Sequence, residues 1–308
     1  MSTVLVTGAS GFIGRHCVPI LMAKNYEVHA IARRKPATAP SGVTWHETDL
    51  LVPGAPTKLI DQVRPESLLH LGWYAAPGKF WEARENTEWV RASLELISAF
   101  SANNGKRVVA AGSCAEYETN CGECVEATTP LLPSTLYGTC KHGLGSILDS
   151  FSKQTGFSSA WGRVFFLYGP HEDPSRLVAY VVRSLLQGEP ALCSTGNQVL
   201  DFLHVQDVAS AFVALLESEV KGPINIASGR PVAVRDLLHK IGEQLGRPEL
   251  IHLGAREASP GTSRIWANTE KLAKEVGWTP RYNLVFGLQQ TIEWWRKYAP
   301  LAHEATDK

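Results

Sequence analysis

The amino-acid sequence predicts an α/β protein in which a doubly wound parallel sheet is accompanied by a smaller, α-rich C-terminal lobe. Short apolar runs alternate with amphipathic helical patterns as far as Gly169 and Pro170, which is typical of repeated βα units. A glycine-rich turn joins the first apolar run to the first helical pattern. Beyond Pro170 this alternation breaks. We expect residues 1–170, with about 196–220, to form the sheet domain, and residues 171–195 and 221–308 to form the lobe.

The individual elements follow from the spacing of apolar residues. The first strand covers Val4–Val6, and further strand patterns lie at residues 28–32, 43–47, 68–71, 108–111 and 160–165. Long helical patterns cover about 79–104 and about 134–151. The later patterns are at residues 177–186, 208–216, 234–245, 269–276 and 284–298. Ligands of doubly wound sheets bind at the carboxyl ends of the strands, so the residues that follow each strand are the first candidates for a site.

Composition and charge favour a small-molecule partner. Lys plus Arg equals Asp plus Glu, at 30 each, so the chain has no net basic field to attract nucleic acid or an anionic membrane surface. No apolar run approaches the roughly 20 residues of a membrane span. The first residues form a strand pattern rather than a targeting segment. We expect a cytoplasmic protein that binds neither nucleic acid nor membrane.

The six cysteines are scattered along the chain, as is usual in a reducing compartment. Cys121 and Cys124 have the C-x-x-C spacing of redox and zinc sites. A structural zinc site needs four ligands, and no second pair follows at a suitable distance. We therefore interpret them as incidental loop cysteines and expect no metal site.

The glycine-rich turn is the strongest signal for a ligand. Gly8, Gly11 and Gly14 are spaced G-x-x-G-x-x-G between the first strand and the first helix. Such a turn lets backbone N–H groups and the positive end of the helix dipole approach a diphosphate. The residues expected to bind the cofactor here are Gly8, Ser10, Gly11, Phe12, Ile13 and Gly14.

The end of the second strand favours NADP(H) over NAD(H). In dinucleotide-binding folds an acidic residue at this position bonds the adenosine ribose, whereas an arginine accommodates a 2′-phosphate. The strand ends in Ala32 and is followed by Arg33 and Arg34, with no carboxylate beside them. A guanidinium matches phosphate oxygens in charge and geometry.

Three residues are candidates for catalysis. Tyr137 and Lys141 are four residues apart, on one face of a predicted helix. A nearby positive charge is expected to lower the pKa of the phenol, so that it exchanges a proton with a carbonyl or alcohol oxygen. Ser113, at the carboxyl end of the fifth strand, is placed to hydrogen-bond the same oxygen.

With these motifs the chain resembles the extended short-chain dehydrogenase/reductases, a superfamily of nucleotide-sugar epimerases, dehydratases and ketoreductases with a Rossmann-like fold. The resemblance covers almost the whole chain, from the glycine turn through Tyr137-x-x-x-Lys141 to Gly277-Trp278-Thr279-Pro280. It implies that Ser113, Tyr137 and Lys141 are catalytic, and that Tyr137 and Lys141 also contact the cofactor. It further implies cofactor contacts by Asp49, Leu50, Leu71, Gly72, Trp73 and Asn86.

Departures from the family pattern bear on the substrate. Cys114 and Ala115 occupy the places where the family's dehydratases carry Asp and Glu, and Glu116 comes one position late, so dehydration is disfavoured. Two positions that often bind diphosphate are Phe166 and Leu200. The candidate substrate contacts are Trp73, Cys114, Ala115, Phe166, Arg176, Arg256 and Arg264, and Trp81 is a further candidate for stacking on a sugar or base.

The first functional hypothesis is NADPH-dependent reduction of a nucleotide-activated 4-keto-6-deoxy sugar, with the proton supplied by Tyr137. The alternatives are a nucleotide-sugar epimerase with retained NAD(P), a reductase of a non-nucleotide carbonyl and a non-catalytic NADP(H) sensor. The resemblance also implies a homodimer formed through the helix at about 79–104 and the Tyr137 helix, with Trp89 and Leu96 as candidate interface positions.

Overall fold

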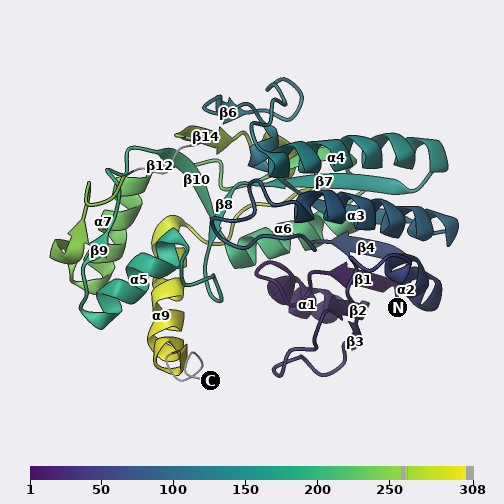
Figure 1. Ribbon diagram of the computed structural model, residues 1–308, viewed down its shortest axis with the longest axis horizontal. Coiled ribbons are helices and arrows are strands. Elements are labelled where there is room, and N and C mark those ends of the chain that lie inside the picture. The colour runs from purple at the N-terminus through teal and green to yellow at the C-terminus, as the bar shows by residue number, and fades with distance from the viewer. Residues whose placement is uncertain (258–260, 262, 303–308) are drawn as a thin grey trace.

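A seven-stranded parallel sheet forms the larger part of the molecule (Figure 1). The computed structural model describes residues 1–257, 261 and 263–302. The strands of the sheet, in spatial order, are β3 (Thr44–Glu47), β2 (Glu27–Ala32), β1 (Thr3–Thr7), β4 (Ser67–His70), β5 (Arg107–Ser113), β7 (Ser158–Val164) and β11 (Gly222–Ile226). The chain builds β1 to β3 outward in one direction and then continues from β4 in the other. The order therefore reverses between β1 and β4, where doubly wound sheets bind their ligands.

Helices cover both faces of this sheet, because alternate side chains of each strand point to opposite faces. Val4 and Val6 pack on the face covered by helices α1 (Gly14–Ala23) and α6 (Val205–Glu217). Leu5 points to the other face. The helices on that second face are α2 (Ala55–Val63), α3 (Glu85–Ala102) and α4 (Leu136–Thr155). The fold class predicted from the sequence is confirmed.

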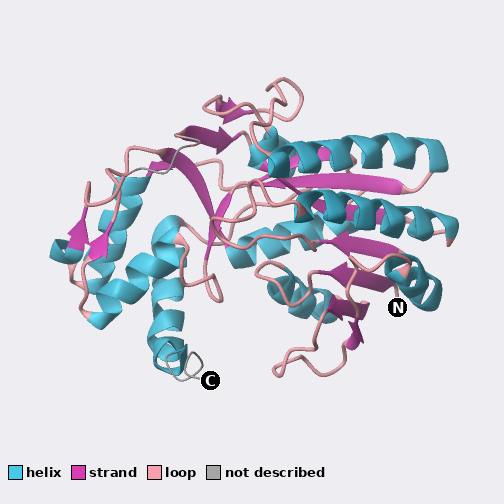
Figure 2. Cartoon of the chain, viewed as in Figure 1, coloured by secondary structure: helices cyan, strands magenta, loops and turns pink. Residues whose placement is uncertain are grey.

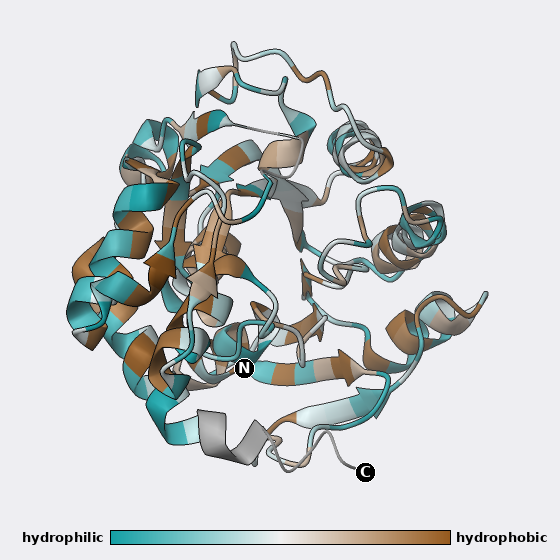
Figure 3. Cartoon of the chain, turned by 60° about the vertical axis from the view of Figure 1, so that its left-hand side comes forward, coloured by the Kyte–Doolittle hydropathy of each residue, from teal (hydrophilic) through white to brown (hydrophobic). Residues whose placement is uncertain are grey.

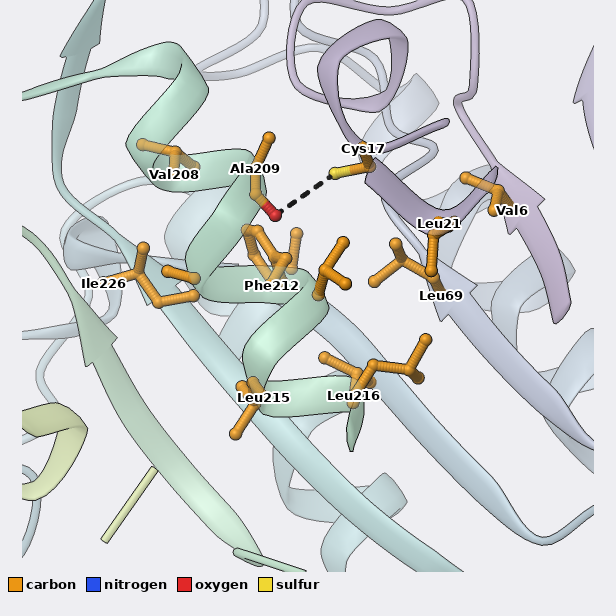
Figure 4. Close-up of a cluster of buried hydrophobic side chains, with 14 of the residues drawn as sticks. Val6, Cys17, Leu21, Leu69, Val208, Ala209, Phe212, Leu215, Leu216 and Ile226 are labelled. Atoms are coloured by element: carbon orange, nitrogen blue, oxygen red, sulfur yellow. Dashed lines mark hydrogen bonds between the residues drawn. The ribbon is translucent and has the colours of Figure 1, made fainter. Parts of the chain in front are cut away.

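The core between α1 and α6 is continuous with the sheet (Figure 4). Phe212 and Leu216 of α6 and Leu21 of α1 belong to this one cluster, and all three are almost completely buried. Burial of each such side chain stabilises the fold by about 1.5–3 kcal/mol. Figure 3 shows the same pattern across the molecule, with apolar residues along the central strands and on the inner faces of the helices.

The smaller lobe contains helices α5 (Leu177–Gln187), α7 (Val234–Leu245) and α9 (Leu284–Ala302), gathered at the left of Figure 1. Its core includes Val181, Leu237 and Leu288, all fully buried. Shorter elements complete it: β9 (Ala191–Leu192), η2 (Pro248–Leu250) and β13 (Ile251–His252). Helix α8 (Glu270–Lys274) contacts β11 of the sheet domain instead.

A second sheet lies between the two parts (Figure 2). Its strands are β12 (Pro231–Ala233), β10 (Val199–His204), β14 (Arg264–Ala267) and β6 (Gly122–Cys124), and β8 (Phe166–Tyr168) also pairs with β10. The fully buried Asp201 carboxylate accepts hydrogen bonds from the backbone N–H groups of Ser228 (2.8 Å), Gly229 (2.9 Å) and Ala267 (3.3 Å). This one side chain ties β10 to β14 and to the loop after β11.

Several boundaries differ from those expected. The helix expected at about 79–104 begins at Glu85, so Trp81 lies on a loop, where Gly78 takes a positive φ of 71°. Residues 221–308 were expected in the lobe, yet β11 is the edge strand of the main sheet because its buried apolar residues pair with β7. Residues 196–220 were expected in the sheet domain, but β10, which lies within them, belongs to the second sheet. Among the described residues, no helix has both the length and the apolar character of a membrane span.

The glycine turn generates a testable prediction. A Cβ atom at Gly14 would lie 2.2 Å from the carbonyl oxygen of Gly8, so Gly14→Ala forces the helix start away from the turn. We expect a loss of about 1–3 kcal/mol in the free energy of unfolding, measured by urea denaturation. The matched control is Gly143→Ala within α4, where a Cβ meets nothing within 4 Å and the higher helix propensity of alanine is expected to be neutral or stabilising. Equal effects of the two substitutions would contradict this account of the turn.

Candidate active site

The glycine turn forms a cradle that has no room for side chains. Gly8 takes a positive φ of 64°, and its carbonyl oxygen accepts the N–H of Gly11 at 2.9 Å. A Cβ at Gly8 would lie 2.8 Å from the backbone nitrogen of Gly72. Among the described side chains none caps the start of α1, and its first turn contains no acidic residue. The N–H groups of Arg15 and His16 donate to the carbonyl oxygens of Gly11 and Ile13, whereas within the described residues those of Phe12, Ile13 and Gly14 have no backbone partner. These three N–H groups remain available for phosphate oxygens, and the cradle fits the diphosphate of a dinucleotide.

A hydrogen-bonded chain of buried side chains holds this cradle against the loop that follows β4. Thr7 Oγ1 accepts the backbone N–H groups of Leu71 (3.1 Å) and Gly72 (2.9 Å), so its own hydrogen goes to Nδ1 of His70 (2.7 Å). The His70 hydrogen is then on Nε2, which donates to Ser93 Oγ at 2.8 Å. Desolvation, assisted by the charge of Lys141, lowers the pKa of His70 to about 3, so the ring is neutral.

The residues expected at the adenosine end lie at the carboxyl ends of β2 and β3. Arg33 and Arg34 follow directly after β2, and both are exposed. Asp49 is exposed and accepts the N–H of Leu51 at 3.0 Å, whereas Leu50 is buried. Two guanidinium groups are therefore open to solvent beside the expected adenosine site.

Ser113 and Tyr137 are brought together by a close approach of two backbones. Ser113 ends β5 and caps the short helix η1 (Cys114–Glu116), with its Oγ accepting the N–H of Ala115 at 3.2 Å. Thr135 caps α4, whose first turn carries Tyr137. A Cβ at Gly138 would lie 2.3 Å from the carbonyl oxygen of Ala115, so α4 begins directly against the serine turn.

Burial is the main cause of the shifted pKa values of Tyr137 and Lys141. Desolvation raises the pKa of Tyr137 to about 12, against smaller opposing effects of the Ser113 hydroxyl and the Arg176 charge. Desolvation also lowers the pKa of Lys141 to about 7, opposed by the charge of Glu116. Lys141 was expected to lower the pKa of Tyr137, but its Nζ lies 6.0 Å from the centre of the tyrosine ring and 3.8 Å from that of Trp73. In this structure Tyr137 is therefore a protonated phenol at neutral pH.

Glu116 holds the backbone of Ser113 through a hydrogen bond. Its carboxylate accepts hydrogen bonds from the backbone N–H of Ser113 (2.8 Å), from Trp161 Nε1 (2.8 Å) and from Arg163 Nε (2.8 Å). Both Glu116 and Arg163 are buried, and a buried ion pair survives only when its polar atoms are satisfied in this way. With its oxygens engaged, Glu116 is a structural group rather than the acid or base of a dehydration. The Ser-x-x-Glu spacing of a capping box is the signal that identifies this role from sequence.

Two aromatic side chains lie beside Tyr137. Phe80 and Trp81 pack edge-on against its ring, with centroids 4.8 Å and 5.8 Å away. Trp81 remains 42% exposed, so an aromatic face is open next to the Tyr137 phenol. Asn86 was expected at the cofactor, but it is fully buried, and its amide bonds Trp73 and the carbonyl oxygens of the loop.

The structure separates the expected substrate residues into two groups. Arg176 precedes α5, lies 5.5 Å from the Phe80 ring and acts electrostatically on Tyr137, so it faces the catalytic end. Cys114 and Ala115 also lie there, directly after Ser113. Arg256 and Arg264 are exposed and stack on the rings of Tyr180 and Trp266.

The two positions that departed from the family pattern pack within the protein. Phe166 packs against Phe202 with ring centroids 5.7 Å apart, and Leu200 is buried in the lobe core.

Cys121 and Cys124 are free cysteines whose side chains are in contact. Their sulfur atoms are 3.0 Å apart, with Cys121 directly before β6 and Cys124 at its end. Within the described residues no cluster of three or more His, Cys, Asp or Glu side chains is arranged to hold a metal ion.

Comparisons with known proteins agree with this geometry. The model of the NAD dependent epimerase/dehydratase family matches residues 4–227. The chain is similar to UDP-glucose 4-epimerase 2 of Oryza sativa subsp. japonica, at 26% identity over 325 residues that cover 92% of this chain and 79% of the relative. It is also similar to CDP-abequose synthase of Salmonella typhimurium, at 22% identity over 309 residues, covering 94% and 97%. Among solved structures, UDP-glucose 4-epimerase of Thermus thermophilus in complex with NAD has a TM-score of 0.85 at 26% identity, covering 96% of this chain and 99% of that chain.

The buried His70 predicts a pH dependence of stability. Its pKa of about 3 in the folded state lies below the value of about 6.5 in the unfolded state, so acidification protonates the unfolded chain first. The stabilising contribution is complete above about pH 6.5 and is lost as the pH falls, at up to about 1.4 kcal/mol per pH unit.

We expect His70→Gln to reduce the slope of unfolding free energy against pH between about pH 6 and 4, as measured by urea denaturation. The control is His239→Gln on α7, which removes an exposed imidazole and should follow the native slope. A native slope in His70→Gln would show that another group carries the acid sensitivity.

Proposed function

Since the chain belongs to the NAD-dependent epimerase/dehydratase family, whose members are NAD(P)-dependent oxidoreductase-type enzymes, we propose that it reduces the keto group of a nucleotide-activated 4-keto-6-deoxy sugar with NADPH. The proposal depends above all on one observation: Ser113 and a protonated Tyr137 meet at the carboxyl end of β5, while Glu116 is withdrawn into an ion pair. The site therefore offers a proton donor and an oxygen-binding hydroxyl, without the free carboxylate that water elimination requires.

The chain's own residues account for the proton in this reaction. The bound cofactor supplies the hydride that the carbonyl carbon gains. Ser113 hydrogen-bonds the carbonyl oxygen and holds it beside Tyr137. Tyr137 donates its phenolic proton to that oxygen as the negative charge develops, and the phenolate later regains a proton from solvent. The Ser113 hydroxyl and the positive charge of Arg176 favour the transient phenolate, because both lower the pKa of Tyr137.

Nucleotide-sugar epimerisation with retained NAD(P) is the second candidate, and the relatives favour it, because UDP-glucose 4-epimerases are among them. Epimerisation uses the same phenol first as a base and then as an acid. A phenol with a pKa of about 12 is poorly suited to the first of these steps in the cofactor-free protein, which favours reduction.

We expect the purified protein to oxidise NADPH with one member of a panel of CDP-, dTDP-, GDP- and UDP-linked 4-keto-6-deoxy sugars, measured by the loss of NADPH absorbance. Simple aldehydes and ketones should give no turnover, since they lack the nucleotide. Tyr137→Phe should abolish turnover and leave NADPH affinity nearly unchanged, because it removes only the proton donor.

Two outcomes of this assay would overturn the proposal. Conversion between two nucleotide sugars without net NADPH consumption would identify the epimerase. Turnover of simple carbonyls alone would identify a reductase of a non-nucleotide substrate. Substantial turnover by Tyr137→Phe would remove this residue from the mechanism.

The preference for NADP(H) rests on Arg33 and Arg34, which are exposed after β2 with no acidic residue adjacent in the sequence. The structurally similar Thermus thermophilus enzyme was solved with NAD, so the cofactor is a discriminating test. We expect the double substitution Arg33→Ala/Arg34→Ala to weaken NADPH binding by about tenfold to a hundredfold and to leave NADH binding nearly unchanged, as measured by calorimetry. Arg64→Ala, at an exposed arginine after α2, serves as the control for a general loss of positive charge. Equal affinity of the native protein for the two cofactors would contradict the assignment.

A homodimer through α3 and α4 remains part of this proposal, although the two candidate contact residues have other roles. Leu96 is fully buried in the chain's own core, and Trp89 packs on the loop after β4. Ile147 of α4 is 45% exposed and is the apolar side chain that this surface offers instead.

A further inference from the structure

The side chain of Lys141 is held in a confined place. The residue is only 4% exposed, and its Nζ donates a hydrogen bond to the carbonyl oxygen of Ala111 at 2.8 Å. The face of Trp73 lies 3.8 Å from the same atom, measured to the ring centroid. This is well within the roughly 6 Å at which an ammonium group is attracted by the ring quadrupole. The ammonium therefore has a carbonyl oxygen and an aromatic face as neighbours.

Trp73 is itself anchored, so its indole is a fixed partner for the lysine. Its Nε1 donates to Oδ1 of Asn86 at 2.8 Å, and its ring stacks on Trp89 with centroids 6.1 Å apart. The Asn86 amide nitrogen in turn donates to the carbonyl oxygens of Phe80 (2.7 Å) and Ala83 (2.8 Å). The hydrogen bond and the stacking contact together restrict rotation of the indole away from Lys141.

The charge state of Lys141 depends on the groups around its ammonium. Glu116 favours the charged ammonium, whereas burial disfavours it and lowers the pKa of Lys141 to about 7. Two other titratable groups face Lys141, His70 on β4 and Tyr137 on α4, and both are neutral at pH 7. An aromatic face stabilises only the charged form. An ammonium group has three N–H donors, so the bond to Ala111 leaves donors for other partners in the site.

We propose that Trp73 is the positioning residue of Lys141, its indole holding the ammonium against the Ala111 carbonyl so that the lysine is placed and charged before a cofactor binds. A role of Trp73 in catalysis rests on the function proposed above. The contact between Trp73 and Lys141 is independent of that function. Trp73 acts through the lysine and is not a catalytic residue.

The position of the ammonium is measured in the full-length, cofactor-free protein by NMR with 13Cε-labelled lysine. The Lys141 signal is identified by its absence from Lys141→Met. We expect it to be displaced upfield by the ring current of Trp73 and to titrate near pH 7, well below the ordinary lysine value of about 10.4. Trp73→Leu should abolish the upfield displacement and lower the titration midpoint by about one pH unit, because the charged form loses the aromatic face.

The matched control is Trp89→Leu, which removes an indole from the same stack without removing the ring that faces Lys141. It should retain most of the displacement and the native midpoint. Trp73→Met and Trp89→Met provide the same comparison with a more adaptable, non-aromatic side chain, should either leucine variant fail to fold. A Lys141 signal that is unaltered in both Trp73 variants, or altered equally by the Trp73 and Trp89 substitutions, would overturn the proposal.

Activity measurements separate this inference from the proposed function. If the protein reduces a nucleotide sugar, Trp73→Leu should move the pH profile of kcat in the direction of the lysine midpoint, and Trp89→Leu should not. If no substrate of the panel is turned over, the proposed function fails, but the NMR comparison still decides whether Trp73 positions Lys141.

Discussion

The contact between the glycine turn and the loop after β4 is the constraint on which the site depends. Gly8 and Gly72 approach so closely that a side chain at Gly8 cannot be accommodated between them. Thr7 uses its one hydroxyl to bind both N–H groups of that loop and to orient His70. The two strands on either side of the reversal in strand order are thereby locked together at the point where the sheet opens to ligand.

The same loop then determines the surroundings of Lys141 and Tyr137, the candidate catalytic residues. Beginning at Gly72, it brings Trp73 onto Lys141 and Phe80 and Trp81 onto Tyr137. Asn86, at the start of α3, closes the loop by bonding its two ends. A segment that is neither helix nor strand thus connects the cradle for the dinucleotide to the groups that are proposed to move the proton.

A buried ion pair supports Ser113. Glu116 and Arg163 lie where water cannot screen them, and the carboxylate is satisfied by three donors, including the backbone of Ser113. Tyr117 extends the arrangement, because its hydroxyl contacts Arg163 and donates to Asn225 on β11. Ser113 is therefore supported by side chains that reach β7 and β11, while Tyr137 is held by α4. Their meeting requires the missing side chain of Gly138, since a Cβ there would collide with the serine turn.

The sequence by itself determined the features that depend on local spacing. Glycines at three-residue intervals after a strand predict the cradle, and Tyr137 and Lys141 share a helix face because four residues make about one turn. The capping-box spacing of Ser113 and Glu116 was also present in the sequence, although its structural meaning became clear only once Arg163 was seen beside it. The helix expected from about residue 79 shows the limit of such patterns, since Trp81 fits a helical stripe but lies on a loop closed by the buried amide of Asn86. Only the tertiary structure decided the direction of the Lys141 ammonium. A lysine side chain has many rotamers, and Lys141 adopts the one that brings its ammonium to Ala111 and Trp73. Both partners are far from Lys141 in the sequence, so no local spacing predicts these contacts.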